Sequence, residues 1–490
     1  MNGDNLIVLA TLIAYKLVLV GVGVWASRRN RTEGDFFLAS QGLGAWVAGL
    51  SYAASTSSAW VLLGFSGFVY ANGLSALWMV PGIWGGYVAV WLFFGRRLRA
   101  ETAERGHVTP TDFLTAGLAD RSRALIGILA SVFILFCFIF YIAAQFGAAA
   151  VAFETQFGLG VTESVLIGAA IVLLYSLLGG FWAVSVTDML QGALMAVVAV
   201  ALPVTALIAA GGFGGIADAL SASAPDGYLD ITGGHAGFLL IGFVLGVWGV
   251  VVNAMGQPQL ISRLMAVKDE RARMRGFTIA IVWAIAVFTG MTILGLAGRA
   301  IVGGAADGEA LFYTLADQLL PPVLAGLVIA AVLSAVMSTV DSILLSASAA
   351  VSHDMRLSRR FAGKEVLVSR IVMAVIAGVA VWMTLSLPAT IFARVLFAWS
   401  ALGAAFGPII VVRVLGLEPK VWAIGTAMCL GFGLTVFFNA LGAIGADSLS
   451  GVMAMLGEWA RAPGDPAERI LPWLPALAVL WWGSRQTATP

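Results

Sequence analysis

The chain has 490 residues, of which 60% are hydrophobic and only 11% are charged, and its mean hydropathy is +0.96. This composition indicates a polytopic protein of the lipid bilayer and leaves no room for a soluble domain of useful size. The formal net charge of +1 excludes a nucleic-acid partner. The two cysteines, Cys137 and Cys429, lie inside apolar runs, so they indicate neither a disulfide framework nor a zinc site.

Apolar windows of about 20 residues, the length needed to cross a bilayer, predict thirteen helices. The first window has no basic segment before it and no small-residue cleavage site, so we expect a retained helix and not a signal peptide. The predicted ranges are 5–26, 45–71, 75–94, 124–152, 162–180, 187–210, 237–256, 276–300, 322–349, 368–387, 394–414, 420–442 and 470–484.

Arginine and lysine are distributed unequally among the segments that join these helices. Most of the 27 basic residues fall in or beside alternate loops, at 28–31, 96–123, 263–275, 356–370, 413–420 and 485. The opposite loops hold only Arg299, Arg394, Arg461 and Arg469. Cytoplasmic loops carry the excess of basic residues, so the pattern predicts a plasma (inner) membrane protein with its N-terminus outside and its C-terminus in the cytoplasm. Lys16 remains, inside the first helix.

The second helix contains four consecutive hydroxyl residues at 55–58, between Ala54 and Trp60. Hydroxyl side chains compete for backbone hydrogen bonds, and Gly64 and Gly67 lower the cost of a bend. An unwound backbone at this depth presents carbonyls to a cation and the N-terminus of a half-helix to a carboxylate. The alternative interpretation is a seam of small residues that packs against another helix.

The segment 179–191 leads into the sixth helix and contains an acid, Asp188, directly after Thr187. One interpretation is that these two residues begin the helix, with the Asp188 carboxylate accepting hydrogen bonds from free amides. The other is that Asp188 lies near the cytoplasmic mouth of an ion path. The two roles are compatible.

The seventh helix has a second interruption. Gly246, Gly249 and Asn253 surround Trp248, and the sequence Gly-Gln-Pro follows at 256–258. Two interrupted helices, five spans apart, are typical of a transporter built from inverted repeats.

The ninth helix, 322–349, has one polar half. At about 100° per residue, seven polar residues fall on the same side and apolar residues occupy the other. The polar residues are Ser334, Ser338, Thr339, Asp341, Ser342, Ser346 and Ser348. A carboxylate facing hydrocarbon costs several kcal/mol, so this half is expected to face protein or water, and its oxygens suit a hard cation. Hydroxyl-mediated helix packing is the alternative, but packing alone does not need Asp341.

Four stretches together resemble the sodium/solute symporter family and, within it, the sodium/proline symporter branch. They are 179–191, 256–266 (GQPQLISRLMA), 335–345 (AVMSTVDSILL) and 398–408 (AWSALGAAFGP). The resemblance implies an all-α polytopic membrane protein with a five-plus-five inverted-repeat core and broken helices 2 and 7. It divides the chain into a first helix with its cytoplasmic loop (1–44), a first repeat (45–211), an extracytoplasmic loop (212–236), a second repeat (237–414) and two peripheral C-terminal helices (415–490).

The resemblance also implies roles for individual residues. The main sodium site would use the backbone carbonyls of Ala54, Ser57 and Ala335 and the hydroxyls of Ser338 and Thr339. A second cation site, which some members build, would use Asp188, Asp341 and Ser342. The solute would contact Ser58 and Trp60 on the second helix, Tyr141 on the fourth, and Trp248 and Gln257 on the seventh.

The function implied is sodium-coupled symport of a small organic solute by alternating access. The resemblance points to proline or another amino acid as the solute and to sodium as the coupling ion, with no organic cofactor and no obligate protein partner. Characterised proline symporters carry an acid where this chain has Thr56, and they place a Trp and a Pro closer together than Trp248 and Pro258. These departures keep open the sodium- or proton-coupled uptake of a monocarboxylate or a similar small acid. A solute-sensing role is the other alternative, because some relatives of this fold are fused to signalling kinases. A membrane enzyme is not indicated, because no base or metal cluster accompanies Asp188 and Asp341.

Overall fold

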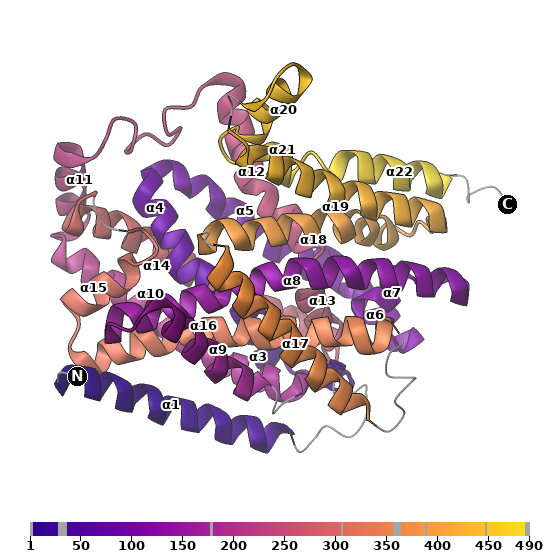
Figure 1. Cartoon of the computed structure of the whole chain (residues 1–490), viewed down its shortest axis with the longest axis horizontal. Coiled ribbons are helices and arrows are strands. Elements are labelled where there is room, and N and C mark those ends of the chain that lie inside the picture. The colour runs from indigo at the N-terminus through magenta and orange to yellow at the C-terminus, as the bar shows by residue number, and fades with distance from the viewer. Residues whose placement is uncertain are drawn as a thin grey trace.

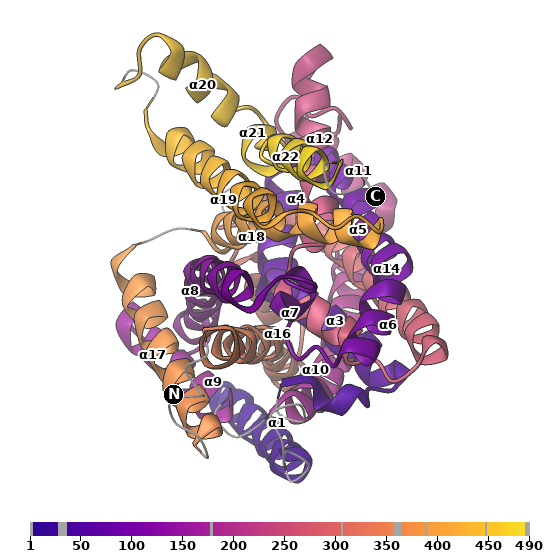
Figure 2. The same cartoon turned by 90° about the vertical axis from the view of Figure 1, so that its right-hand side faces the viewer.

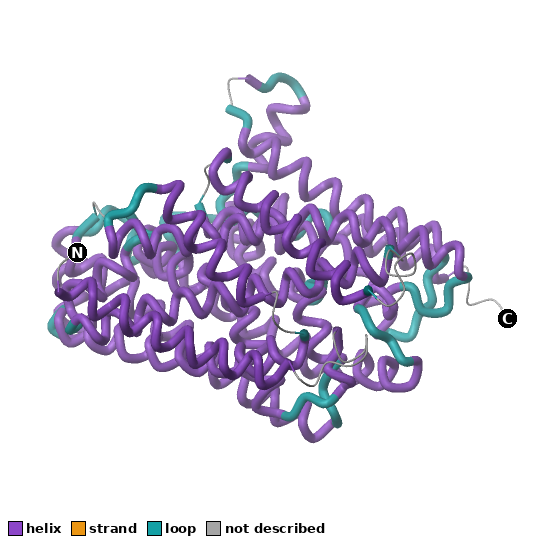
Figure 3. The backbone as a smooth tube through the Cα atoms, turned by 60° about the horizontal axis from the view of Figure 1, so that its bottom comes forward, coloured by secondary structure: helices purple, strands orange, loops and turns teal. Residues whose placement is uncertain are grey.

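The computed structural model describes residues 3–27, 37–176, 180–304, 307–355, 364–387, 390–445 and 448–485. Over these residues the chain forms helices and no β-strand, apart from one isolated bridge between Leu43 and Val267 (Figure 3). The prediction of an all-α membrane protein is therefore confirmed. Nine continuous helical segments in this part of the chain are long and apolar enough to cross a bilayer, and one of them, Ala45–Arg105, contains both the second and the third predicted helix.

The helices of the first half include a second span that changes its geometry partway. In chain order they are α1 (Gly3–Ser27), η1 (Ala39–Gln41), α3 (Ala45–Ala59), η2 (Trp60–Phe65), α4 (Ser66–Asn72), η3 (Gly73–Trp78), α5 (Met79–Val88), η4 (Ala89–Phe94), α6 (Gly95–Arg105), α7 (Pro110–Leu114), α8 (Asp120–Phe157), α9 (Val161–Ser176), α10 (Phe181–Ala209) and α11 (Gly212–Ser223). The segment η2 is π-helical, and it continues α3 into α4.

The second half follows with a comparable division in its first span. Its helices are α12 (Gly237–Ala254), α13 (Pro258–Met265), α14 (Glu270–Val302), α15 (Leu311–Leu319), α16 (Pro322–Ala349), η5 (Ala350–Asp354), α17 (Glu365–Ser386), α18 (Ile391–Val414), α19 (Val421–Ala443), α20 (Val452–Ala460), α21 (Pro466–Arg469) and α22 (Trp473–Arg485). The bounds of α16 coincide with the predicted range 322–349.

The interior of the bundle is built around α16. In both perpendicular views α16 lies among α3, α8 and α10, whereas α1 lies along one edge and α19, α20 and α22 lie along the opposite edge (Figures 1 and 2). Contacts between α16 and α3, α8 and α10 agree with these views. Because α16 is enclosed by protein, its polar half does not need to face hydrocarbon.

Small residues allow some helices to cross at very short range. A Cβ atom added at Gly290 on α14 would lie 1.9 Å from the Ala199 carbonyl oxygen of α10. A Cβ atom added at Gly431 on α19 would lie 2.0 Å from the Ala404 carbonyl oxygen of α18. Neither contact is tolerable, so glycine is required where these helices cross, as is common between membrane helices.

Gly431→Ala should destabilise the protein, because the new methyl group would force α19 away from α18. We expect a loss of about 1–3 kcal/mol, which is typical of overpacking. Gly433 provides a matched control, because it lies on the same helix and a Cβ atom there has nothing within 4 Å. Gly433→Ala should be neutral or slightly stabilising, as alanine favours a helix by about 1 kcal/mol over glycine. Thermal unfolding in detergent measures both, and equal shifts would contradict the close crossing.

Candidate functional site

The second span loses helical geometry at Ser58. This residue has φ 33° and ψ −172°, which lie outside the helical region and in a region that costs an L-residue about 1–3 kcal/mol. The Ala59 amide that follows donates a hydrogen bond to Gln145 Oε1 of α8, at 3.3 Å. The Trp60 amide lies 3.2 Å from Ser58 Oγ. Side chains therefore replace part of the backbone hydrogen bonding at the interruption.

The seventh span is interrupted between α12 and α13. Gln257 precedes α13 with φ −84° and ψ 108°, an extended conformation, and Pro258 begins the new helix. The carboxamide nitrogen of Gln257 donates to the carbonyls of Asn253, at 3.0 Å, and Trp399, at 2.9 Å. The predicted solute residue Gln257 therefore ties the interruption to α18, since its donors are used on backbone carbonyls.

Oxygen atoms from α3 and α16 meet beside the interruption in the second span. Ser338 Oγ lies 3.5 Å from the Ala54 carbonyl oxygen and 3.1 Å from the Ala335 carbonyl oxygen. The Thr339 hydroxyl is buried and has no hydrogen-bond partner among the residues that the structure describes, and the buried Ser57 hydroxyl lies close to that of Tyr87. Buried hydroxyls without partners are uncommon and need an explanation. Carbonyl and hydroxyl oxygens gathered in this way fit a hard cation, because they supply the oxygen ligands that such ions prefer.

A buried ion pair lies next to these oxygens. Asp188 Oδ2 of α10 is 2.6 Å from a guanidinium nitrogen of Arg263 on α13, and both side chains are almost completely buried. Ser51 and Ser55 of α3 donate to the same carboxylate oxygen, at 2.9 and 3.3 Å. The Arg263 Nε atom donates to Ser51 Oγ at 2.8 Å. The pair thus joins α3, α10 and α13.

Two expectations for this region are wrong. Asp188 does not begin the sixth helix, because α10 starts at Phe181, with Gly180 as its cap. Arg263 does not lie in a loop, because α13 carries it into the bundle. The signal for Arg263 was present in the sequence, since it is the only charged residue between Gly256 and Lys268.

The residues predicted for a second cation site are only partly brought together. Arg263 contacts both Asp188 and Ser342, and Ser342 Oγ also donates to the Ser338 carbonyl at 2.6 Å. Asp341 instead accepts a hydrogen bond from Ser176 on α9, while its second oxygen is buried and has no partner within the described ranges. In this structure a guanidinium therefore neutralises Asp188.

Lys16 of α1 approaches the same helix from outside the core. Its ammonium contacts the sulfur of Met337 on α16, one turn before Asp341. Met337 is not one of the seven polar residues of α16, so Lys16, which lacked a partner in the sequence, contacts this helix outside its polar half.

The predicted solute residues do not all lie together. The buried Tyr141 hydroxyl is close to Ser58 and to the indole of Trp399, but its geometry toward both falls short of a normal hydrogen bond. Trp60 lies among Phe65, Phe288 and Phe392, with ring centroids 6.0–6.5 Å apart.

The structure places Trp248 elsewhere. Its side chain is 38% exposed, and its indole nitrogen donates to the Trp78 carbonyl at 2.8 Å. Its backbone packs against Gly82 of α5, where an added Cβ atom would lie 3.1 Å from the Trp248 Cα atom. The expectation that Trp248 lines the site with Trp60 and Tyr141 finds no support in these contacts, because the interruption falls two turns further along, after Ala254.

Aromatic residues cover the site on the side where α15 lies. Phe68 of α4 stacks on Phe392 of α18, with centroids 5.0 Å apart. Glu309, in the turn before α15, accepts hydrogen bonds from the Ile391 and Phe392 amides at 3.1 and 3.0 Å. Burial raises the pKa of Glu309, while these two hydrogen bonds act in the opposite direction. The Glu309 carboxylate therefore caps the start of α18, where Phe392 packs against Trp60.

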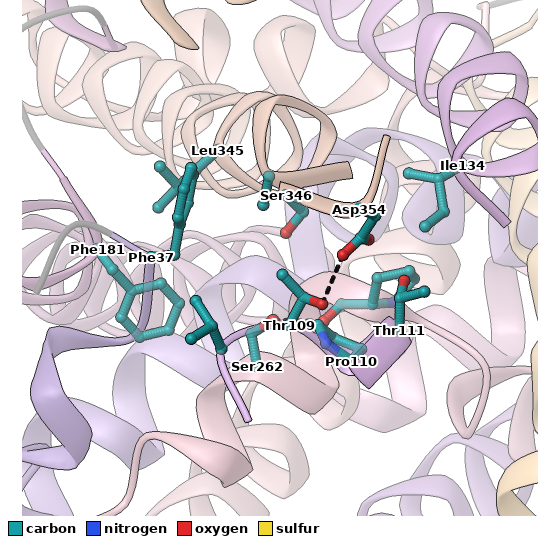
Figure 4. Close-up of a pocket in the computed structure, with 13 residues that line it drawn as sticks. Phe37, Thr109, Pro110, Thr111, Ile134, Phe181, Ser262, Leu345, Ser346 and Asp354 are labelled. Carbon is teal, nitrogen blue, oxygen red and sulfur yellow. Dashed lines mark hydrogen bonds between the residues drawn. The ribbon is translucent and has the colours of Figure 1, made fainter. Parts of the chain in front are cut away.

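A small cleft of about 20 Å³ lies beside α10, α13 and α16 (Figure 4). It is lined by Phe181 of α10, Ser262 of α13 and Leu345 of α16, among others. These elements also carry Asp188, Arg263 and Ser342. Thr109 donates to Asp354 across the mouth of the cleft, at 2.8 Å. The site thus lies between a covered end and a narrow cleft.

Removing the charge of Arg263 should destabilise the protein strongly, because Asp188 would stay buried without a counter-charge. For Arg263→Gln we expect a loss of about 3–5 kcal/mol. Adding Asp188→Asn should recover part of this loss, which a double-mutant cycle of thermal unfolding would show. Arg105→Gln removes the exposed pair with Glu101, 3.6 Å apart, and should cost less than about 1 kcal/mol. Strictly additive losses at Arg263 and Asp188 would contradict the buried pair.

Comparisons with known proteins agree with this geometry. A sequence profile described as the sodium:solute symporter family matches residues 36–418. The osmoregulated proline transporter OpuE of Bacillus subtilis is 32% identical over 433 residues, which cover 86% of this chain and 87% of the relative. The sodium/proline symporter of Escherichia coli is 33% identical over 414 residues, 82% of this chain and 81% of the relative. A solved Na⁺-coupled sialic acid symporter, in a substrate-bound outward-open state, shares the fold, with a TM-score of 0.71 and 17% identity over 95% of this chain and 98% of that one. The chain belongs to the sodium:solute symporter family.

Proposed function

We propose that this protein couples the entry of sodium to the uptake of a small organic solute, with proline as the best candidate. The observation that carries the proposal is the approach of the Ser338 hydroxyl to the Ala54 and Ala335 carbonyls, next in sequence to the Thr339 hydroxyl, which is buried without a hydrogen-bond partner in the described part of the chain. The proline transporters similar to this chain support the choice of solute. The distribution of basic residues supports an N-terminus outside the cell and a C-terminus in the cytoplasm.

Coupling would follow from the position of the sodium ligands. Ala54 and Ser57 lie directly before the strained Ser58, and Ser338 and Thr339 lie on the enclosed α16. A sodium ion between them would hold the second span in one shape, and that shape presents Ser58 and the amides after it to the solute. Each ligand then raises the affinity for the other by the same factor, commonly worth 1–3 kcal/mol. The repeats 45–211 and 237–414 would rock to expose the site alternately.

A second cation at Asp188, Asp341 and Ser342 remains a prediction. It requires the Arg263 guanidinium to leave its present contacts with Asp188 and Ser342, because like charges repel in a buried site. It also requires Asp341 to turn from Ser176.

Uptake of a monocarboxylate is the second candidate function. It is favoured by Thr56, whose hydroxyl donates to the Tyr52 carbonyl at 2.7 Å and offers no charge to a solute ammonium group. A carboxylate needs hydrogen-bond donors, which the amides after Ser58 supply, and it does not need an acid.

The function is tested by uptake into proteoliposomes. We expect an inward sodium gradient, but not a potassium gradient, to drive accumulation of labelled L-proline. A panel of amino and carboxylic acids in the same assay separates the two candidate solutes. Accumulation driven by a proton gradient alone, or no accumulation of any panel member, would refute sodium symport.

Ser338→Ala and Thr339→Ala should each raise the sodium concentration for half-maximal uptake about tenfold, the effect of losing about 1.4 kcal/mol. Ser348→Ala is the control, because Ser348 is equally buried on α16 but donates to its own helix, to the Leu345 carbonyl at 3.1 Å. Its sodium dependence should match that of the wild type. If the Ser338 and Thr339 variants also match the wild type, these residues do not bind the ion.

A further inference from the structure

We infer that Gln145 and Trp399 complete the solute site and that, with Tyr141, they bind a carboxylate group of the solute. Neither Gln145 nor Trp399 was singled out by the sequence. The inference rests on the proposed transport function, and it adds the side chains that recognise the carboxylate shared by both candidate solutes.

The first observation is a pair of buried donors beside the interruption in the second span. The Tyr141 hydroxyl and the Trp399 indole nitrogen are both buried, and neither makes a hydrogen bond of normal geometry with any residue that the structure describes. They come from different helices, α8 and α18, and the Tyr141 hydroxyl lies close both to Trp399 and to Ser58. A buried donor without a partner costs about 1–3 kcal/mol, so a ligand acceptor here would recover a substantial free energy.

The second observation is the position of Gln145. It follows Tyr141 by four residues, so the two side chains lie on the same face of α8. Its Oε1 atom accepts from the Ala59 amide at 3.3 Å, and its Nε2 atom lies 3.4 Å from Ser58 Oγ. Both hydrogen bonds are long. The neutral side-chain oxygen of Gln145 thus accepts from the first backbone N–H group of the half-helix that begins after Ser58.

The chemistry of these groups selects a carboxylate. The Ala59 amide, the Tyr141 hydroxyl, the Trp399 indole and the Gln145 NH₂ group all donate, and the N-terminal end of the half-helix favours negative charge. A solute carboxylate can accept from the Ala59 amide in place of Gln145 Oε1. Gln145 can then turn its NH₂ group toward the same carboxylate, while Tyr141 and Trp399 donate to the second oxygen. Charge-assisted hydrogen bonds of this kind are about twice as strong as neutral ones.

Two substitutions test the inference. Trp399→Phe keeps an aromatic ring but removes the N–H group, and should raise the KM for L-proline about tenfold. Gln145→Glu keeps the shape but opposes a second carboxylate, and should raise this KM at least 100-fold. Trp283→Phe is the control, because the Trp283 indole donates to the Gly192 carbonyl at 2.7 Å, so the loss of its N–H group should leave KM unchanged. L-prolinamide, which lacks the carboxylate, should compete at least tenfold more weakly than L-proline in the wild type.

Stabilisation by sodium against thermal unfolding, measured for each variant, shows whether it is folded and still binds the ion. If Gln145→Glu fails this check, Trp399→Phe and prolinamide decide the result. Wild-type KM in Trp399→Phe together with equal competition by prolinamide would overturn the inference while leaving sodium-driven uptake intact. Absence of sodium-driven uptake in the wild type would instead overturn the proposed function.

Discussion

The structure depends on one constraint, which is that a peptide backbone inside a bilayer must have its polar groups satisfied. The second span breaks helical geometry at Ser58, which is completely buried, so the freed backbone groups need partners from the protein. Gln145 of α8 takes the Ala59 amide, and Ser338 of α16 meets the Ala54 carbonyl. The polar side chains beside the break therefore satisfy backbone groups that the helix no longer pairs. A cation and a carboxylate would bind to these same backbone groups, so the contacts that stabilise the break also form the proposed ligand site.

The buried charge of Asp188 is balanced by the protein itself, because the Arg263 guanidinium lies 2.6 Å from its carboxylate. An ionised group in a low-dielectric interior costs several kcal/mol unless it is paired. Arg263 also connects α13 with Ser51 of α3 and with Ser342 of α16. One guanidinium on α13 thus contacts α3, α10 and α16. The ion pair therefore connects the two proposed repeats.

Much of the fold could be predicted from the sequence, because apolar length is a local property. The range predicted for the ninth helix, 322–349, matches α16 at both ends. The start of α10 was misjudged, because Thr187 and Asp188 have the composition of a helix cap but lie within a helix that begins at Phe181. A cap is a matter of backbone conformation, and composition alone does not determine it.

The partners of polar side chains were less predictable. Gln145 and Trp399 lie in apolar helices and have no motif of their own, so their position beside Ser58 emerges only when α8 and α18 pack. Trp248 shows the same dependence on packing. It lies among glycines that suggest a break, but its indole is directed to Trp78 because the break comes after Ala254. The periodicity of a sequence shows which face of a helix is polar. Which residues of other helices contact that face depends on how the helices pack.

The central claim is that sodium binds between the broken second span and α16 and holds the break in one shape. Hydrogen–deuterium exchange of the backbone amides in peptides covering residues 53–60 tests it most directly. Sodium should slow exchange in this segment relative to an equal concentration of potassium, and Ser338→Ala should remove the difference. Equal exchange rates in the two ions would contradict the account.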